Sequence, residues 1–135
     1  MRRRQFLGLV TGGAIWPIAA TAQPVTRHIG VLVLGNPNPD LFLKELRDGL
    51  RELGHLENRG IQLQVRSAGG NAGALADAAA DLVRLKVDII VAWQTPAATA
   101  AKRATAEIPI VMTAGDPVGT GLVASLSRPG GNVTG

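Results

Sequence analysis

Short, almost continuous apolar runs alternate with amphipathic stretches along most of the chain. Residues 28–34 are nearly all apolar and precede the turn-forming Asn-Pro-Asn-Pro segment at 36–39, which predicts a buried parallel strand. The next stretch, residues 40–53, carries leucines at steps of three and four residues with charged residues between them. That spacing predicts an amphipathic helix, which Asp40 caps at its start and Gly54 ends.

The same alternation of strand and helix continues through the middle of the chain. Residues 61–66 alternate between apolar and polar side chains, which predicts a strand at an edge of the sheet with one wetter face. A second amphipathic helix is predicted after Asn71, a plausible cap, and extends to about residue 86. Residues 87–93 are again almost all apolar and predict a third strand.

A third helix is predicted to begin at Thr95 and Pro96 and to extend to residue 106. Threonine is a favoured N-cap, and proline suits the first helical turn because that turn leaves its amides unbonded. Residues 108–113 predict a fourth strand, and a short helix is expected around residues 121–126.

Four strands joined by helical crossovers predict an α/β fold with a doubly wound parallel sheet in the order 2-1-3-4. In such sheets ligands bind beyond the carboxyl ends of the strands, at the switch point between strands 1 and 3. The loops at that edge carry the unusual residues of the chain. The candidate ligand-binding residues are Asn36 after the first strand, Gln94, Thr95, Pro96 and Ala97 after the third, and Asp116 after the fourth.

Three residues near this edge have two interpretations each. Asp116 is either a ligand-binding carboxylate or a turn residue before Pro117, where aspartate is favoured because its side chain accepts local amide hydrogen bonds. Thr95 caps its helix in either case, and the amides of a helix N-terminus can also receive an anion such as a carboxylate. Trp93 belongs either to the core or to the wall of a ligand cleft.

The first 22 residues have the organisation of a signal peptide: a basic start, a short apolar stretch and an Ala-x-Ala site. Cleavage is expected after Ala22, so that Gln23 begins the mature chain. The segment Arg3-Arg4-Gln5-Phe6-Leu7 is similar to the twin-arginine export motif, and an ordinary Sec signal is the alternative. The apolar stretch is shorter than the roughly 20 residues that a transmembrane helix needs. Because no cysteine follows it to carry a lipid, we expect a mature chain that is periplasmic and not membrane-anchored.

The composition narrows the remaining possibilities. A chain of 135 residues is the size of one domain. The net charge of +4 suggests nucleic-acid binding, but three of the basic residues lie in the N-terminal run. Without them eleven basic residues face ten acidic ones. We therefore expect no nucleic-acid partner.

The residues also argue against catalysis. Cysteine is absent and no Gly-x-Ser-x-Gly motif occurs, while His28 and His55 fall at the opposite edge of the predicted sheet. Two histidines so placed make a poor metal site. The Gly-x-Gly-x-x-Ala sequence at 119–124 follows the fourth strand, whereas a dinucleotide motif follows the first. No catalytic residue, metal or cofactor is predicted.

The order and spacing of many short motifs together resemble the ABC-transporter substrate-binding protein family, which includes tryptophan- and tyrosine-binding members. The motifs extend from end to end of the chain: Arg3-Arg4-Gln5-Phe6, Ile29-Gly30-Val31-Leu32, Gly49-Leu50-Arg51-Glu52-Leu53-Gly54, Thr95-Pro96-Ala97-Ala98, Gly115-Asp116-Pro117-Val118, Gly121-Leu122-Val123-Ala124-Ser125-Leu126 and Arg128-Pro129-Gly130-Gly131-Asn132-Val133-Thr134-Gly135. The resemblance implies a periplasmic receptor with two α/β lobes of the type I binding-protein fold. Such a receptor closes on a small molecule and delivers it to an ABC permease in the inner membrane.

Carried onto this chain, the resemblance implies that the Thr95-Pro96-Ala97 turn receives a ligand carboxylate, and that the loops of Asn36 and Asp116 line the same cleft. Residues 23–135 correspond to the N-terminal lobe, so the expectation is a truncated chain or fragment that lacks the second lobe. Trp93-Gln94 stands where the family is expected to have smaller residues, which leaves the ligand open. Two other functions stay open: a periplasmic ligand-sensing domain and a small α/β enzyme.

Overall fold

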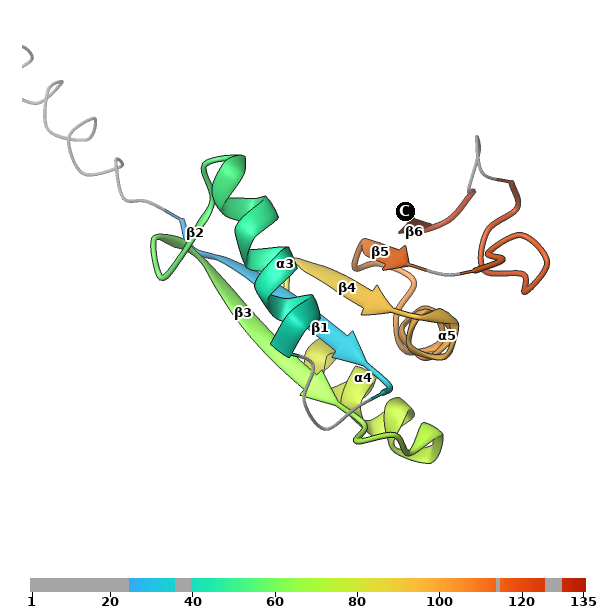
Figure 1. The fold of residues 1–135 in the computed structure, drawn as a ribbon. Coiled ribbons are helices and arrows are strands. Elements are labelled where there is room, and N and C mark those ends of the chain that lie inside the picture. The colour runs from blue at the N-terminus through green and yellow to red at the C-terminus, as the bar shows by residue number, and fades with distance from the viewer. Residues whose placement is uncertain (1–24, 36–39, 114, 126–129) are drawn as a thin grey trace, which may run out of the picture.

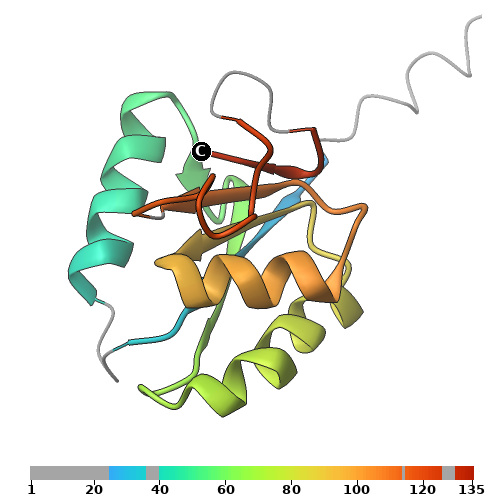
Figure 2. The ribbon, with the colours of Figure 1, turned by 90° about the vertical axis from the view of Figure 1, so that its right-hand side faces the viewer.

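The computed structural model describes residues 25–35, 40–113, 115–125 and 130–135. The elements in chain order are β1 (Arg27–Val33), α3 (Asp40–Glu52), β2 (Leu56–Glu57), β3 (Gly60–Ser67), the 3-10 turn η1 (Ala72–Ala74), α4 (Leu75–Arg84), β4 (Ile89–Trp93), α5 (Thr95–Ala104), β5 (Ile110–Thr113) and β6 (Val133–Thr134). The strands form one parallel sheet (Figure 1). Helix α3 covers one face, while α4 and α5 cover the other (Figure 2).

The predicted strand order is confirmed for the four main strands. The sheet order is β2-β3-β1-β4-β5-β6, so the central part reads 2-1-3-4 in the order of the predicted strands. The predicted number of strands is wrong, because the sheet has six strands and not four. The two additional strands are two residues long each and lie at the two edges. As a result β3 is not an edge strand.

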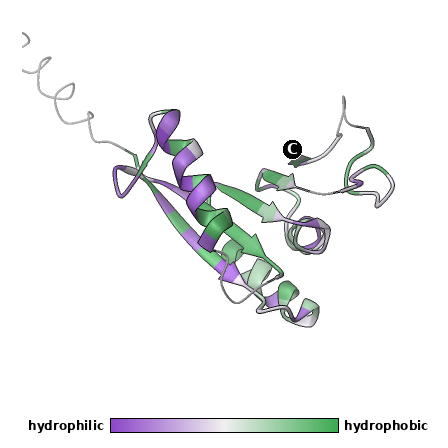
Figure 3. Ribbon diagram, in the orientation of Figure 1, coloured by the Kyte–Doolittle hydropathy of each residue, from purple (hydrophilic) through white to green (hydrophobic). Residues whose placement is uncertain are grey.

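The alternation of side chains along the central strands divides the core into two layers. Leu32 of β1 and Ile90 of β4 are fully buried on the face covered by α4 and α5. Val31 and Val33 of β1 point to the opposite face, where Leu43 of α3 packs on them. Figure 3 shows mainly hydrophobic residues along β1 and β4, alternating ones along β3, and hydrophilic ones along the outer side of α3. A sheet buried on both faces explains why these strands read as continuous apolar runs.

Gly30 allows α4 to approach the sheet closely. A Cβ at this position would lie 3.0 Å from Cδ2 of Leu82 and 3.1 Å from Cγ2 of Val87. Leu82 is fully buried in this contact. The absence of a side chain at Gly30 is therefore part of how the helix packs on β1.

The β6 edge is held by Asn132, a residue to which the sequence analysis assigned no role of its own. Its side-chain amide donates to the carbonyl oxygens of Thr105 at 3.1 Å and Ile108 at 2.8 Å. Its own carbonyl accepts the amide of Ile110 at 2.8 Å. Asn132 therefore joins the last strand to the loop that leads into β5.

The short helix expected around residues 121–126 is not formed in its described part, 121–125. A turn occupies residues 117–121 instead, and Leu122 and Val123 are buried against the core. The Lys102 ammonium on α5 donates to the carbonyls of Gly121 at 2.7 Å and of Leu122 at 3.1 Å. In a helix these two backbone carbonyls would accept hydrogen bonds from amides of the helix itself, whereas here they accept them from Lys102.

The predicted signal peptide and its cleavage site between Ala22 and Gln23 lie outside the described residues. Among the helices of the described part, none has the length and apolar character required to span a bilayer.

Candidate functional site

The carboxyl ends of β1, β4 and β5 lie level with one another. Val33 is paired in register with Trp93, and Trp93 is paired with Thr113. The loops that follow these three strands therefore start side by side, at the switch point where the chain leaves the sheet toward opposite faces. This is the edge at which the candidate ligand-binding residues were predicted.

Gln94 connects the ends of the three strands. Its amide donates to the carbonyl of Thr113 at 2.8 Å and lies 3.3 Å from the Thr113 hydroxyl. Its carbonyl accepts the first hydrogen bond of α5, from the amide of Ala98 at 3.1 Å. Its side-chain Oε1 lies 3.8 Å from the point where a Cβ of Gly35 would stand. Gln94 is thus hydrogen-bonded to the end of β5 and to the start of α5, and its side-chain oxygen lies near Gly35 after β1.

The backbone of Gln94 is in an unusual conformation. Its φ is 74° and its ψ is 158°, a region that side-chain-bearing residues rarely adopt. Holding such a residue there costs on the order of 1–3 kcal/mol, and strain of this kind clusters at binding and catalytic sites. Among the predicted site residues that the structure describes, Gln94 is the one with a strained backbone.

The prediction that Thr95 caps α5 is wrong. Gln94 occupies the N-cap position and makes no side-chain capping bond, while Thr95 is the first helical residue and Pro96 the second. The carbonyl of Thr95 accepts a hydrogen bond from the Thr99 hydroxyl at 2.9 Å. Because Gln94 supplies no side-chain capping bond, it leaves the partial positive charge of the helix N-terminus toward the carboxyl edge.

The other residues of this turn differ in exposure. Pro96 is exposed and Thr95 is half-buried, but Ala97 is fully buried against the sheet. Thr95 and Pro96 also lie at one end of an apolar groove of about 740 Å³ between α4 and α5. Ala97 therefore supports the turn from below, and the surface of the turn belongs to Gln94, Thr95 and Pro96.

Asp116 acts as a turn residue in the structure. Its Oδ1 accepts the amide of Gly119 at 2.8 Å, and its backbone carbonyl accepts both the hydroxyl and the amide of Thr120. A Cβ at Gly119 would meet the Asp116 carboxylate, so a side chain at this position would displace that carboxylate from its hydrogen bond. Asp116 is exposed and follows β5. Within the described residues no hydrogen bond joins it to Gln94. Asn36 lies outside the described residues, directly after Gly35.

An aromatic pair flanks this edge on the face of α3. The rings of Phe42 and Trp93 are stacked with centroids 4.8 Å apart and an interplanar angle of 4°. Both side chains are half-buried beside the α3-face core. The sequence left Trp93 open as core or cleft wall, and in the structure it is partly buried against the α3-face core. Phe42 was missed, although its place in the first turn after the 36–39 loop put it near the same edge.

The chemistry offered by this edge is that of binding. It presents an amide, a hydroxyl, an uncapped helix start, an exposed carboxylate and an aromatic surface. Over the part of the chain that the structure describes, no three His, Cys, Asp or Glu side chains gather as metal ligands would. His28 lies at the amino end of β1, and His55 lies between α3 and β2.

The chain is similar to known proteins over most of its length. The profile of a family described as ABC transporter substrate binding protein matches residues 28–135. A tyrosine-binding protein from Clostridioides difficile (strain R20291) is 39% identical over 111 residues, which are 81% of this chain and 32% of that protein.

Two solved structures have the same fold at similar levels of identity. The ABC domain in complex with L-Trp from Streptococcus pneumoniae matches with a TM-score of 0.75 and 36% identity, over 82% of this chain and 38% of that one. A conserved domain protein from Vibrio cholerae matches with a TM-score of 0.76 and 37% identity, over the same shares of the two chains. The chain thus spans about a third of the length of these relatives.

Proposed function

Because the chain belongs to the ABC transporter substrate-binding protein family, we propose that it captures a small amino-acid ligand outside the cytoplasm for import through an ABC permease. In this proposal residues 23–135 form one lobe of the receptor, and the ligand binds at the carboxyl edge of its sheet. The protein acts by binding, without a catalytic residue, metal or cofactor.

The strained backbone of Gln94 is the observation that carries the proposal. It lies between the ends of β1 and β5 and directly before an uncapped helix N-terminus. A helix N-terminus favours negative charge, and a free amino acid brings a carboxylate. We expect that carboxylate to bind at the turn of Gln94, Thr95 and Pro96, with the Asn36 loop beside it.

The two remaining groups of an amino acid also have counterparts at this edge. Its ammonium group needs an anion, and Asp116 offers an exposed carboxylate in the loop after β5. Its side chain needs an apolar surface, and the Phe42–Trp93 pair offers an aromatic one, which favours a ring in the ligand. One relative is a tyrosine-binding protein, and another was solved with L-Trp. An aromatic amino acid is therefore the ligand class that we propose.

The N-terminal sequence supports export to the periplasm. Residues 1–22 act as a twin-arginine or Sec signal in this proposal, with cleavage between Ala22 and Gln23. The mature chain then meets its ligand and its permease outside the inner membrane.

Binding by the chain is best measured by NMR, since contacts from one lobe alone are expected to bind weakly. L-tryptophan, L-tyrosine and L-leucine are titrated into the 15N-labelled protein, with tryptamine as the control that lacks the carboxylate. Saturable shifts are expected with the aromatic amino acids for the amides of Gln94, Thr95, Ala97 and Ala98, and for those of residues 115–116 and 118–120. Tryptamine should leave the amides of Thr95, Ala97 and Ala98 unmoved. Shifts that are absent from this edge with every amino acid would refute the proposed site.

A matched variant tests the role of the Gln94 side chain. Gln94→Ala keeps a Cβ and hence the backbone preference, but it removes the amide that lies beside Gly35. Weaker binding with an unchanged spectrum elsewhere is expected. Equal affinities of the variant and the natural protein would exclude a direct contact from this side chain.

A further inference from the structure

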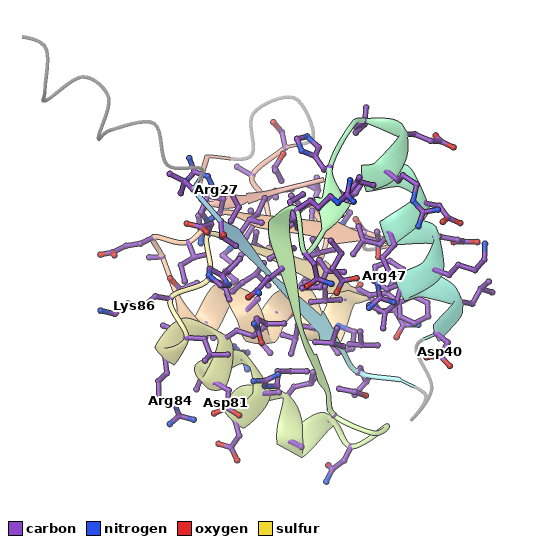
Figure 4. All side chains as sticks on the ribbon, turned by 90° about the vertical axis from the view of Figure 1, so that its left-hand side faces the viewer. Arg27, Asp40, Arg47, Asp81, Arg84 and Lys86 are labelled. Carbon is purple, nitrogen blue, oxygen red and sulfur yellow. The ribbon has the colours of Figure 1, made fainter. Side chains whose placement is uncertain are left out.

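A second hollow lies at the opposite edge of the sheet, between α3, β2 and β3. Its volume is about 220 Å³. Leu50, Leu56 and Ile61 contribute apolar side chains to its lining, and three arginines contribute charge: Arg47, Arg51 and Arg59. Figure 4 shows Arg47 between α3 and β3, and it places Arg27, at the amino end of β1, far from Asp40, which follows the carboxyl end. None of the described candidate ligand-binding residues lines the hollow, which is therefore separate from the candidate ligand site.

The acidic groups nearby leave much of this positive charge unpaired. Glu57 accepts a hydrogen bond from Arg47 Nε at 2.7 Å and is the single acidic residue in the lining. Asp48 is engaged by Lys44 at 2.8 Å. This hydrogen bond lowers the pKa of the Asp48 carboxyl and raises that of the Lys44 ammonium. Arg51 approaches Asp48 only to 3.9 Å.

Arg59 has no ion pair with any of the described residues. It is exposed on the turn between β2 and β3, and its guanidinium donates no hydrogen bond to another described residue. It also lines an adjacent hollow of about 330 Å³, which reaches Arg27 and Asp88 at the starts of β1 and β4. Arg59 thus stands between two depressions of one basic surface.

The net charge of the residues that line this hollow indicates which class of ligand fits it. Three guanidinium groups against the one carboxylate of Glu57 leave two positive charges around the hollow. A phosphate monoester carries close to two negative charges near neutral pH and has three terminal oxygens. Arginine binds such oxygens with its planar fork of donors. A carboxylate also fits a guanidinium fork, but it carries one charge and would leave one of the two positive charges unbalanced.

We propose that this hollow binds a phosphate-bearing anion. Its oxygens bind Arg51 and Arg59, and a short apolar substituent packs on Leu50 and Leu56. The free phosphate ester and the phosphate of a lipid headgroup share this chemistry. Because the site lies at the amino edge of the sheet, it can be occupied while a ligand is bound at the carboxyl edge.

The test uses the full chain and two soluble probes, inorganic phosphate and mono-n-butyl phosphate, titrated by NMR at constant ionic strength. Saturable shifts of the amides of residues 55–61 are expected, with tighter binding of the butyl ester because of the apolar lining. Vesicles of phosphatidylglycerol, compared with phosphatidylcholine in co-sedimentation, test the lipid source. Binding to the anionic vesicles alone would assign the site to a lipid headgroup.

Matched variants separate a built site from diffuse charge. Arg59→Gln is expected to weaken binding about tenfold, as for loss of one charge-assisted contact. Arg103→Gln removes the same charge from α5 and is expected to change binding less than about twofold, because a distant exposed charge acts only through screened solvent. Arg51→Gln serves as a second variant should the first fail to fold. Equal effects at Arg59 and Arg103, or no binding of either phosphate probe or of anionic vesicles, would overturn the proposal.

Discussion

Replacing Gln94 by glycine should make the protein more stable, although the substitution removes a side chain from the candidate site. Gln94 has φ 74° and ψ 158°, a conformation that glycine adopts without a Cβ penalty. Relief of this strain contributes about 1–3 kcal/mol. Glycine also gains entropy in the unfolded chain, which offsets about 0.4–1 kcal/mol of that. The net expectation is a free energy of unfolding higher by about 1 kcal/mol.

The assay is urea unfolding followed by circular dichroism, supported by thermal unfolding. For a domain of this size, 1 kcal/mol corresponds to a Tm increase of about 4 °C. Gln94→Ala is the control, because it removes the same amide but keeps the Cβ that causes the strain. It should change stability by less than about 0.5 kcal/mol, as an exposed substitution does. The reasoning is refuted if the glycine variant is no more stable than the alanine variant.

The same substitution should have the opposite effect on ligand binding. A glycine at position 94 gives the backbone of the turn more conformational freedom. Ordering the turn around a ligand then costs more entropy. Under the proposed function the glycine variant is therefore more stable and binds the amino acid more weakly. If the glycine variant gains stability and keeps its full affinity for the amino acid, the strained conformation of Gln94 is not needed for ligand binding.

Three further predictions concern packing, hydrogen bonding and charge. Asn132→Asp replaces a donor that faces two carbonyl oxygens with a third acceptor. It should lower the midpoint of urea unfolding by the equivalent of about 2 kcal/mol. An unchanged midpoint would show that these two hydrogen bonds do not stabilise the β6 edge of the sheet. Gly30→Ala should cost about 1–3 kcal/mol, because its Cβ meets α4 at 3.0 Å. By contrast Gly49→Ala, on α3 with open space around it, should add about 1 kcal/mol, and equal signs in these two variants would contradict the packing argument. Lys44 lowers the pKa of the Asp48 carboxyl below its ordinary value of 3.8. The ion pair is therefore intact at neutral pH and is lost as the pH falls through that lowered pKa. Lys44→Gln should raise the pKa of the Asp48 carboxyl, which an NMR titration of that carboxyl measures.

The topology of this protein was largely predictable from its sequence. Strands buried on both faces are almost continuously apolar, and the amphipathic stretches between them have the length of helical crossovers. Right-handed crossovers leave few arrangements of such units, so the 2-1-3-4 order followed from the pattern. The place of the candidate site followed as well, because the loops after three parallel strands must meet at one edge of the sheet.

What the sequence by itself did not determine depends on contacts between distant segments. Two-residue strands such as β2 and β6 are too short to have a pattern and exist only through their pairing. Glutamine carries no signal for a positive φ, and Gln94 is held in that conformation by Thr113, 19 residues away on another strand. The stacking of Phe42 on Trp93 and the unpaired charge of Arg59 depend in the same way on which elements pack together. The local pattern of apolar and polar residues therefore determined the elements and their order. The strain at Gln94, the aromatic surface and the basic hollow were decided by tertiary packing, because each of these three features arises between residues that only the fold brings into contact.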